Sequence, residues 1–275
     1  MSTMETLTGA IPTLDTDGIP VHLVTAEPAL QVIAEAAAHN SRRPLAVASI
    51  NLDHLHHFGR HTHHDGAPTE GPVEWLNLID GAPIAAHAKR ETGREYPKLS
   101  GSDLIVEVLE LAAQRGLSVA VLGGDAALTE PLRERLATGW PNASFAGHWT
   151  PPRELLSSPE GADAIAADIR RARPDILLVC LGKPRQEQWI EQYGPQTGAG
   201  VLLAFGAVVD FLAGRVSRAP QWISRAGFEW AWRLLLEPRR LANRYLVQGP
   251  PAYLALRRPA PPVARQPILG VPRHA

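Results

Sequence analysis

Asp80 is the first candidate for chemistry in this chain. It stands with Gly81 at the end of the short apolar run 77–82 (N-L-I-D-G-A), just before Pro83 and a helical pattern over 84–92. An aspartate beside a flexible glycine at the carboxyl end of a strand is well placed to act as a general base. The competing interpretation is a turn or helix-capping aspartate, which is the more frequent role for this residue type.

A second candidate lies in residues 174–188, P-D-I-L-L-V-C-L-G-K-P-R-Q-E-Q. The apolar run 176–181 predicts a strand buried on both faces, and Gly182 ends it. Pro184 suits the first position of a helix, which places Gln186 in the first helical turn. Free N–H groups at such a helix start favour an anion such as a diphosphate, although an ordinary strand–turn–helix would read the same way.

Two glycines follow the strand pattern at 118–122. Gly123 and Gly124 would let the backbone approach a phosphate or a sugar closely. The surrounding sequence is not G-x-G-x-x-G, so the dinucleotide-binding fingerprint is absent.

A histidine-rich segment raises the question of a metal site. Its histidines are His54, His56, His57, His61, His63 and His64. On a helix, His57 and His61 would share a face, but a zinc site needs a further ligand and no H-E-x-x-H pattern is present. We interpret the segment as a solvated loop and expect no metal.

The elements that must position these residues alternate between strand and helix. Strand patterns occur at 45–50, 118–122, 143–147, 176–181 and 200–205, and helical patterns at 26–39, 84–92, 104–112, 126–137 and 161–172. Right-handed crossovers then predict an α/β fold: a Rossmann-like, mainly parallel sheet with helices on both faces.

Composition limits the cellular context. The 275 residues suffice for one large domain with an appendage, and the net charge of −1 gives no general attraction to nucleic acid. The single Cys180 excludes an internal disulfide, fits a reducing compartment and is expected to be a core residue. With neither a signal peptide nor a membrane-length apolar run, we expect a cytoplasmic protein.

Composition and sequence pattern divide the chain into four parts. We expect a flexible lead-in over 1–20, an α/β catalytic domain over 21–213, a helical appendage over 214–258 and a flexible tail over 259–275. The appendage carries nine arginines (215, 218, 225, 233, 239, 240, 244, 257, 258) against Glu229 and Glu237, interleaved with tryptophans. This mixture suits an anionic membrane surface or a phosphate-bearing substrate, or else the solvated face of a packed subdomain. No nucleic-acid-binding module accompanies the charge.

Several blocks together resemble glycosyltransferase family 26, which includes the N-acetylmannosamine transferases of wall teichoic acid and the N-acetylmannosaminuronic acid transferases of enterobacterial common antigen. The blocks run in family order from about residue 45 to 250: S-x-N-L-D-H-L, I-D-G-A-P-I, K-L-S-G-S-D-L, V-L-G-G, P-D-I-L-L-V-C-L-G-K-P-R-Q-E-Q-W-I, G-A-V-V-D-F-L-A-G-R-V-S-R-A-P and F-E-W-A-W-R-L-L-L-E-P-R-R-L.

The resemblance implies a bacterial enzyme that transfers a sugar with inversion from a UDP-sugar to an undecaprenyl-diphosphate-linked acceptor. The sugar would be N-acetylmannosamine, its uronic acid or a glucose-type sugar, and neither a metal nor another cofactor would be needed. The enzyme would act as a peripheral protein on the inner face of the plasma membrane, where its appendage meets anionic lipid. The oligomeric state is left open, including a homo-oligomer.

The resemblance also implies roles for individual residues. Asp80 would be the general base, Ser49 (where the family commonly has Thr) and Asn51 would line the sugar pocket, and Gln186 would hydrogen-bond near the reacting carbon. The substrate-binding set would be Asp210 for UDP, the glycines 123 and 124, Lys98 at a position that is often Arg, and Arg218, Arg233, Arg240 and Arg244 for the diphosphate. An arginine fork grips two phosphate oxygens, whereas a lysine offers one point charge.

Three alternatives from other classes remain at this stage. A nucleotide-binding oxidoreductase or methyltransferase could use a similar sheet, although the glycine fingerprint is missing. A non-catalytic membrane-surface module would leave Asp80 and Gln186 without a task. A metalloenzyme built on the histidine-rich segment would lose activity on chelation.

Overall fold

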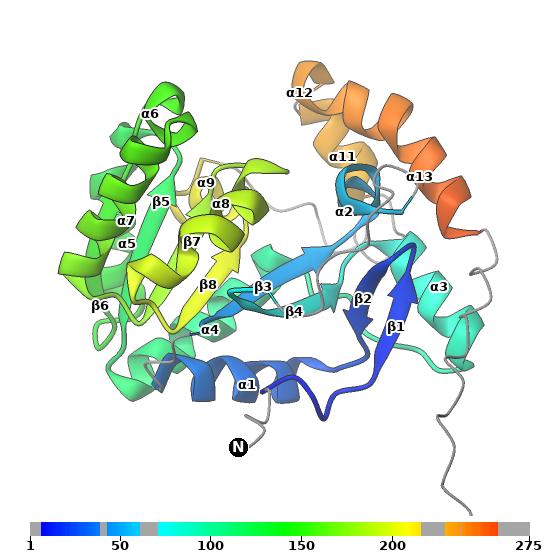
Figure 1. Cartoon of the computed structure of the whole chain (residues 1–275), viewed down its shortest axis with the longest axis horizontal. Coiled ribbons are helices and arrows are strands. Elements are labelled where there is room, and N and C mark those ends of the chain that lie inside the picture. Colours follow the sequence, from blue (N-terminus) through cyan, green and yellow to red (C-terminus); the bar gives the residue numbers. More distant parts are fainter. Residues whose placement is uncertain (1–6, 39–42, 61–70, 216–228, 237, 258–275) are drawn as a thin grey trace, which may run out of the picture.

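The computed structural model describes residues 7–38, 43–60, 71–215, 229–236 and 238–257. Its centre is a six-stranded parallel sheet in the order β4-β3-β8-β7-β5-β6 (Figure 1). The strands are β3 (Leu45–Ile50), β4 (Glu74–Ile79), β5 (Ser118–Gly123), β6 (Ser144–Trp149), β7 (Ile176–Cys180) and β8 (Val201–Ala204). The predicted α/β fold with a mainly parallel sheet is confirmed.

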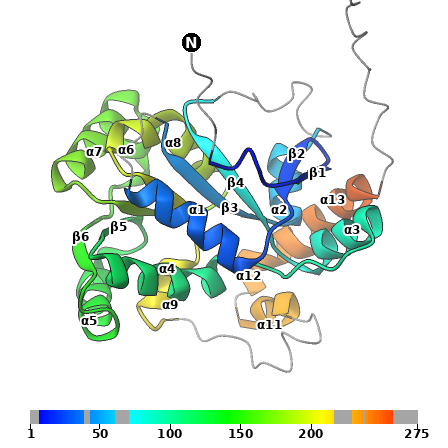
Figure 2. The ribbon, with the colours of Figure 1, turned by 90° about the horizontal axis from the view of Figure 1, so that it is seen from below.

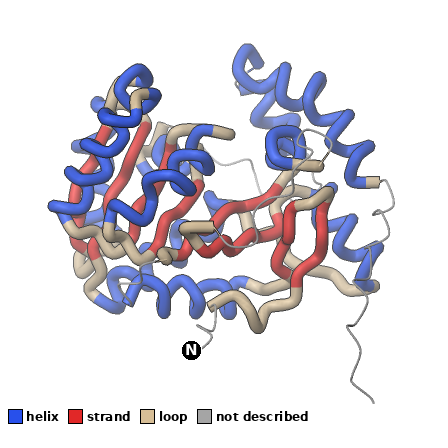
Figure 3. The backbone as a smooth tube through the Cα atoms, viewed as in Figure 1, coloured by secondary structure: helices blue, strands red, loops and turns tan. Residues whose placement is uncertain are grey.

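Helices cover both faces of this sheet, so that strands lie in the middle layer (Figure 3). One face packs against α1 (Ala26–Ala38), α4 (Gly101–Arg115), α5 (Thr129–Gly139) and α9 (Val208–Leu212). The other face packs against α2 (Leu52–Phe58), α3 (Ala82–Thr92), α7 (Pro159–Ala172) and α8 (Arg185–Tyr193). Shorter pieces are the 3-10 turns η1 (Ala126–Leu128) and η2 (Gly194–Thr197) and the helix α6 (Arg153–Ser157).

The continuous apolar runs in the sequence correspond to strands that are buried on both faces of the sheet. In β7, Ile176 and Leu178 belong to one hydrophobic cluster, while Leu177 and Val179 belong to the other. Because successive side chains of a strand point to opposite faces, only a strand covered twice can be apolar at every position. The carboxyl ends of all six parallel strands consequently share one edge of the sheet, where the polar residues that follow them gather.

The beginning of the chain differs from expectation. β1 (Thr13–Thr16) and β2 (Ile19–His22) pair as an antiparallel hairpin, which begins inside residues 1–20, the stretch expected to be a flexible lead-in. The turn is Asp17–Gly18, both with positive φ (53° and 91°), which is the combination that two-residue hairpin turns favour. The hairpin is held to the sheet because the N–H of Asn77 in β4 donates to Nδ1 of His22 at 3.0 Å.

The described residues after 228 are helical and lie at the sheet's carboxyl edge (Figure 1). It contains α11 (Glu229–Leu236), α12 (Pro238–Ala242), the π-helical turn η3 (Asn243–Gln248) and α13 (Gly249–Leu256). Ala252 and Leu256 of α13 join the cluster that includes Leu55 of α2, and Figure 2 shows α13 running beside α3. We refer to the described residues 229–236 and 238–257 as the C-terminal helices. No helix in the described ranges has the length and apolar character needed to cross a membrane.

Candidate active site

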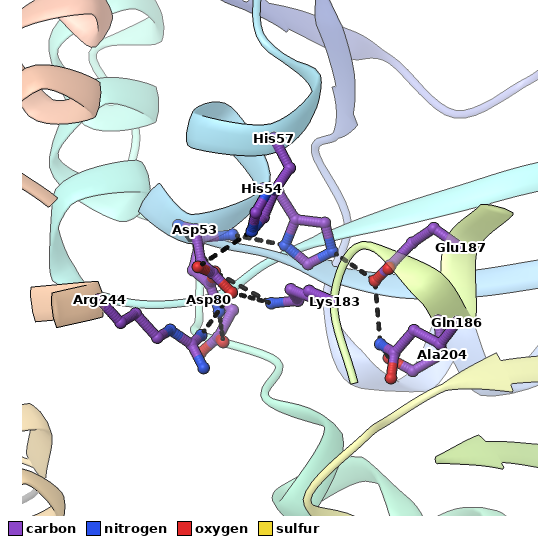
Figure 4. A network of polar contacts seen from close by, with 10 residues as sticks. Asp53, His54, His57, Asp80, Lys183, Gln186, Glu187, Ala204 and Arg244 are labelled. Carbon is purple, nitrogen blue, oxygen red and sulfur yellow. Dashed lines mark hydrogen bonds and ion pairs between the residues drawn. The ribbon is translucent and has the colours of Figure 1, made fainter. Parts of the chain in front are cut away.

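A polar network lies at the carboxyl edge of the sheet, and Figure 4 shows Asp80, His54 and Lys183 within it. Asn51 is the junction of this network. It follows β3 directly and caps α2: its Oδ1 accepts from the N–H of Asp53 at 3.2 Å. Its side-chain Nδ2 donates to Oδ2 of Asp80 at 2.9 Å, and its backbone N–H donates to Nδ1 of His54 at 3.3 Å. One residue therefore connects the candidate base to a second, buried set of side chains.

Asp80 is held at the end of β4 by the backbone. Its N–H donates to the carbonyl of Ile50 at 2.9 Å, which continues the pairing of β4 with β3 past the last strand residue. Gly81 then takes φ +79°, a conformation that favours glycine, and α3 begins at Ala82. Asp80 stays partly exposed, so its carboxylate is accessible to a substrate.

The buried arm of the network joins α2 to α8. Nε2 of His54 lies 3.2 Å from Oε1 of Glu187, and Nε2 of Gln186 donates to the same oxygen at 2.9 Å and to the carbonyl of Ala204 at 2.8 Å. His54 is 2% exposed, Gln186 1% and Glu187 6%. Among the described residues, Oε1 of Gln186 and Oε2 of Glu187 are buried acceptors without a hydrogen-bond partner.

The protonation of this arm follows from burial. Burial, together with the positive charge of Lys183, lowers the pKa of His54 to about 4, so the imidazole is neutral at pH 7. Because Nδ1 accepts from the Asn51 N–H, the network assigns the proton to Nε2, the atom that faces Glu187. Burial alone would raise the pKa of the Glu187 carboxyl, but the contacts with His54, Lys183 and Gln186 outweigh it and hold that pKa below its ordinary value.

Two cations meet at the carboxylate of Asp53 in α2. Nη2 of Arg244 lies 3.3 Å from Oδ2 of Asp53, and Nζ of Lys183 lies 3.9 Å from the same oxygen. Nζ of Lys183 also donates to Oδ1 of Asn51 at 3.1 Å. Arg244 comes from η3 in the C-terminal helices, and Lys183 from the turn between β7 and α8. Segments far apart in the sequence thus place positive charge beside Asn51 and Asp80.

A polar edge of this composition supports transfer chemistry. It combines a partly exposed carboxylate, two nearby cations and two buried acceptors, all fixed by elements of the sheet. The family model for the "Glycosyl transferase WecG/TagA/CpsF family" matches residues 14–262. The chain belongs to this family.

Two curated relatives carry the same printed name, N-acetylglucosaminyldiphosphoundecaprenol N-acetyl-beta-D-mannosaminyltransferase. The protein from Bacillus subtilis (strain 168) is 28% identical over 166 residues, which cover 59% of this chain and 61% of the relative. The protein from Staphylococcus aureus (strain NCTC 8325 / PS 47) is 27% identical over 166 residues, covering 60% and 63%. The matched part thus spans less than two thirds of each relative's length.

The site of this WecG/TagA/CpsF family member contains some of the residues expected from the sequence. Asp80, Asn51, Gln186 and Arg244 belong to one network. Ser49 lies one residue before the end of β3, 7% exposed, and its Oγ donates to the carbonyl of Leu99 at 2.9 Å. Because a hydroxyl oxygen can still accept, its place in a sugar pocket stays a prediction.

The glycines of β5 have a packing role that the sequence did not reveal. A Cβ on Gly123, which has φ +101°, would lie 2.5 Å from the carbonyl oxygen of Cys180 in β7. A Cβ on Gly124 would lie 3.1 Å from the side chain of Val209, the residue before Asp210 in α9. The close approach at Gly123 is therefore to a neighbouring strand. Substrate binding by Gly123, Gly124 and Asp210 stays a prediction.

The other expected contacts lie apart from the network or outside the described side chains. Lys98 is exposed in the segment between α3 and α4. Arg218 lies outside the described residues, and Arg233 and Arg240 lie in α11 and α12, where their side chains are not described. Their predicted contacts with a diphosphate remain predictions.

The interpretation of the histidine-rich segment as a solvated loop is wrong for its first half. Residues 52–58 form α2, and His54 is a buried member of the network. His61, His63 and His64 lie outside the described residues. Within the ranges described, no group of three or more His, Cys, Asp or Glu side chains is arranged to hold a metal ion.

Sequence reasoning missed four members of this candidate site: Asp53, His54, Lys183 and Glu187. The spacing Asn51-x-x-His54 at the end of a buried strand was an available signal, because an N-cap and the third helical residue can bond reciprocally. Lys183 had no comparable signal, since it stands 132 positions from its partner Asn51. Cys180 is a core residue as expected, and burial raises the pKa of its thiol to about 12.

Proposed function

We propose that this protein transfers a sugar from a UDP-sugar to an undecaprenyl-diphosphate-linked acceptor, with inversion, in the synthesis of a bacterial cell-surface polysaccharide. Membership in a glycosyltransferase family and the printed names of the relatives support this proposal. The observation that carries it is the partly exposed Asp80 carboxylate, held by Asn51 within a network that contains Lys183 and Arg244. The same family membership leaves the oxidoreductase and methyltransferase alternatives unsupported.

Asp80 would act as the general base on the acceptor. Its carboxylate would take the proton from the acceptor hydroxyl as that oxygen forms a bond to the anomeric carbon of the donor sugar. The bond from this carbon to the diphosphate oxygen breaks in the same step, and its electron pair leaves with UDP. Attack from the side opposite the leaving group inverts the configuration. Asp53 is less suited to this role because its carboxylate already contacts two cations.

The departing diphosphate needs positive charge. Arg244 lies at the Asp53 carboxylate beside Asn51 and would stabilise the developing charge, and we propose the same task for Arg218, Arg233 and Arg240. In the proposed reaction, Gln186 would use its unpaired Oε1 near the reacting carbon. Since guanidinium groups would neutralise the leaving group, we expect turnover to be unchanged by a chelator.

A lipid-linked acceptor requires the enzyme to work at a membrane surface. Among the described residues, five of the six exposed large apolar side chains lie in the C-terminal helices: Leu235, Leu246, Val247, Tyr253 and Leu254, the sixth being Leu155 of α6. Arg239 and Arg257 are exposed in the same helices. We propose that this combination associates peripherally with anionic lipid on the inner face of the plasma membrane.

The donor is proposed to be UDP-N-acetylmannosamine, because both relatives are named for N-acetylmannosamine transfer. Its uronic acid and glucose-type sugars are the other candidates. Thermal unfolding in the presence of each UDP-sugar would rank them, since a ligand that binds only the folded state raises its stability.

The decisive experiment substitutes the candidate base. We expect Asp80→Asn to lower the rate of transfer by about 10²- to 10⁴-fold, the usual contribution of a general base, with UDP binding nearly unchanged by calorimetry. Asp163→Asn, an exposed position on α7, is the matched control and should retain full turnover. Retained turnover in Asp80→Asn would contradict the assignment of the base.

A further inference from the structure

We propose that Lys183 is a positioning residue for Asp80, acting through the side-chain amide of Asn51. This inference rests on the proposed function, because it concerns the residue assigned as the base. Lys183 would not touch the acceptor: it would fix the group that fixes the carboxylate.

The hydrogen-bonding chemistry allows only one orientation of the Asn51 amide. A lysine ammonium can only donate, and an ionised carboxylate can only accept. With Nζ of Lys183 at 3.1 Å from Oδ1 and Oδ2 of Asp80 at 2.9 Å from Nδ2, a flipped amide would set two donors against each other and two acceptors against each other. Lys183 and Asp80 therefore fix the orientation of the Asn51 side-chain amide that lies between them.

The amide is further fixed by its capping role. Oδ1 of Asn51 also accepts from the N–H of Asp53 at 3.2 Å, so the side chain is tied to the start of α2. A positive charge on the amide oxygen strengthens the hydrogen bond that the amide nitrogen donates, because linked hydrogen bonds polarise one another. The chain Lys183–Asn51–Asp80 thus holds one oxygen of the candidate base at a defined place on the sheet's edge.

Lys183 is positioned for this task by the turn after β7. Gly182 has φ +74°, which lets the chain reverse there, and the Lys183 side chain is only 14% exposed. The neighbouring Arg185 is exposed and its guanidinium donates to the carbonyl of Leu181 at 2.7 Å. Of these two cations, the less exposed one, Lys183, lies in the network of the base.

The charge of Lys183 depends on its surroundings. Burial and the positive charge of Arg244, opposed by the acidic groups Asp53, Glu187 and Asp80, lower the pKa of the ammonium to about 8. The titratable and charged groups around it are Asp53, His54 and His57 from α2, Asp80 after β4, Glu187 from α8 and Arg244 from η3. The ammonium is largely protonated at pH 7 and loses its charge above about pH 8, so turnover should fall on the alkaline side.

The test compares Lys183→Met and Lys183→Arg with Lys89→Met, which changes an exposed lysine of α3. Sugar transfer is measured from about pH 6 to pH 9 on the full chain. We expect Lys183→Met to lower kcat about tenfold or more while KM for the donor changes less than about threefold, and to abolish the alkaline fall. Lys183→Arg, which stays protonated, should restore part of kcat at pH 7 and also lack the alkaline fall.

A second readout does not depend on turnover. The nitrogen NMR signal of the Asn51 side-chain amide should move in Lys183→Met and stay in place in Lys89→Met. An unmoved Asn51 signal, or an unchanged kcat with an unchanged pH profile in folded Lys183→Met, would overturn the positioning role. If the unsubstituted protein transfers no sugar from any UDP-sugar, the proposed function fails instead, and the NMR comparison still decides the role of Lys183.

Discussion

Arg244 contacts Asp53 through Nη2 and Oδ2 at 3.3 Å, and this contact joins the C-terminal helices to the first helix after β3. The same Oδ2 lies 3.9 Å from Nζ of Lys183. Asp53 is therefore the shared counter-ion of two cations that arrive from different parts of the chain. Its side chain is 8% exposed, so the carboxylate is poorly screened by water.

Removing this counter-ion should loosen the C-terminal helices. In Asp53→Asn, Arg244 and Lys183 would face each other without a carboxylate between them, which is unfavourable in a partly buried place. We expect backbone amides of α13 to exchange with solvent about tenfold faster, as measured by hydrogen–deuterium exchange. Glu130→Gln, which breaks an exposed ion pair with Arg133 on α5, should leave α13 unchanged. Unaltered exchange in Asp53→Asn would show that the ion pair contributes little.

The buried histidine predicts how stability depends on pH. The unfolded chain binds a proton at His54 with an ordinary pKa of 6.5, whereas the folded protein resists protonation until about pH 4. Stability is thus fully present above pH 6.5 and falls as the pH drops towards 4, by about 3 kcal/mol in total. The lowered pKa of Glu187 acts in the same direction. Urea unfolding at a series of pH values measures how steeply the free energy of unfolding changes with pH.

His54→Gln should remove most of this slope, while His56→Gln, a neighbour on α2 outside the network, should keep it. A slope that is identical in His54→Gln and in the unsubstituted protein would mean that other groups control acid unfolding.

The sheet was predictable because burial leaves a direct mark on the sequence. The run around Ile176 is apolar at every position, and such a strand is buried on both faces only where helices cover both sides of the sheet. The N-terminal hairpin was missed because two strands of four residues carry little periodicity, although its Asp17–Gly18 turn is a recognisable signal.

The site was predictable where it depends on position in an element, and not where it depends on a tertiary partner. Asn51 and Asp80 directly follow the last residues of β3 and β4, and the ends of strands can be predicted from the sequence. The burial of His54 depends on Glu187 in α8, and the orientation of Asn51 depends on Lys183, so neither follows from local pattern. The polar composition of the histidine-rich segment alone predicted a solvent-exposed loop, whereas His54 is nearly fully buried.

Gly206 should tolerate no side chain, because it lies against the buried amide of Gln186. A Cβ at this position would lie 2.7 Å from Oε1 of Gln186 and 3.4 Å from Cα of Gly182. We expect Gly206→Ala to lower the free energy of unfolding by about 1–3 kcal/mol, as overpacking does in cores. Gly139→Ala at the end of α5, where a Cβ meets nothing within 4 Å, is the control and should be neutral or stabilising. Equal melting temperatures for the two variants would mean that the Gln186 amide can move freely.

The exposed apolar side chains of the C-terminal helices should control membrane binding. We expect the triple variant Leu246→Glu, Val247→Glu, Leu254→Glu to reduce co-sedimentation with anionic phospholipid vesicles by more than about tenfold. Each substitution removes apolar surface that would enter the lipid and adds a charge that anionic lipid repels, and the three positions are 60%, 62% and 61% exposed, so the fold should be retained. Leu155→Glu, at an exposed leucine of α6, adds one such charge outside the C-terminal helices and should co-sediment as the unsubstituted protein does. If the triple variant binds vesicles as well as Leu155→Glu does, the C-terminal helices are not the surface that meets the lipid.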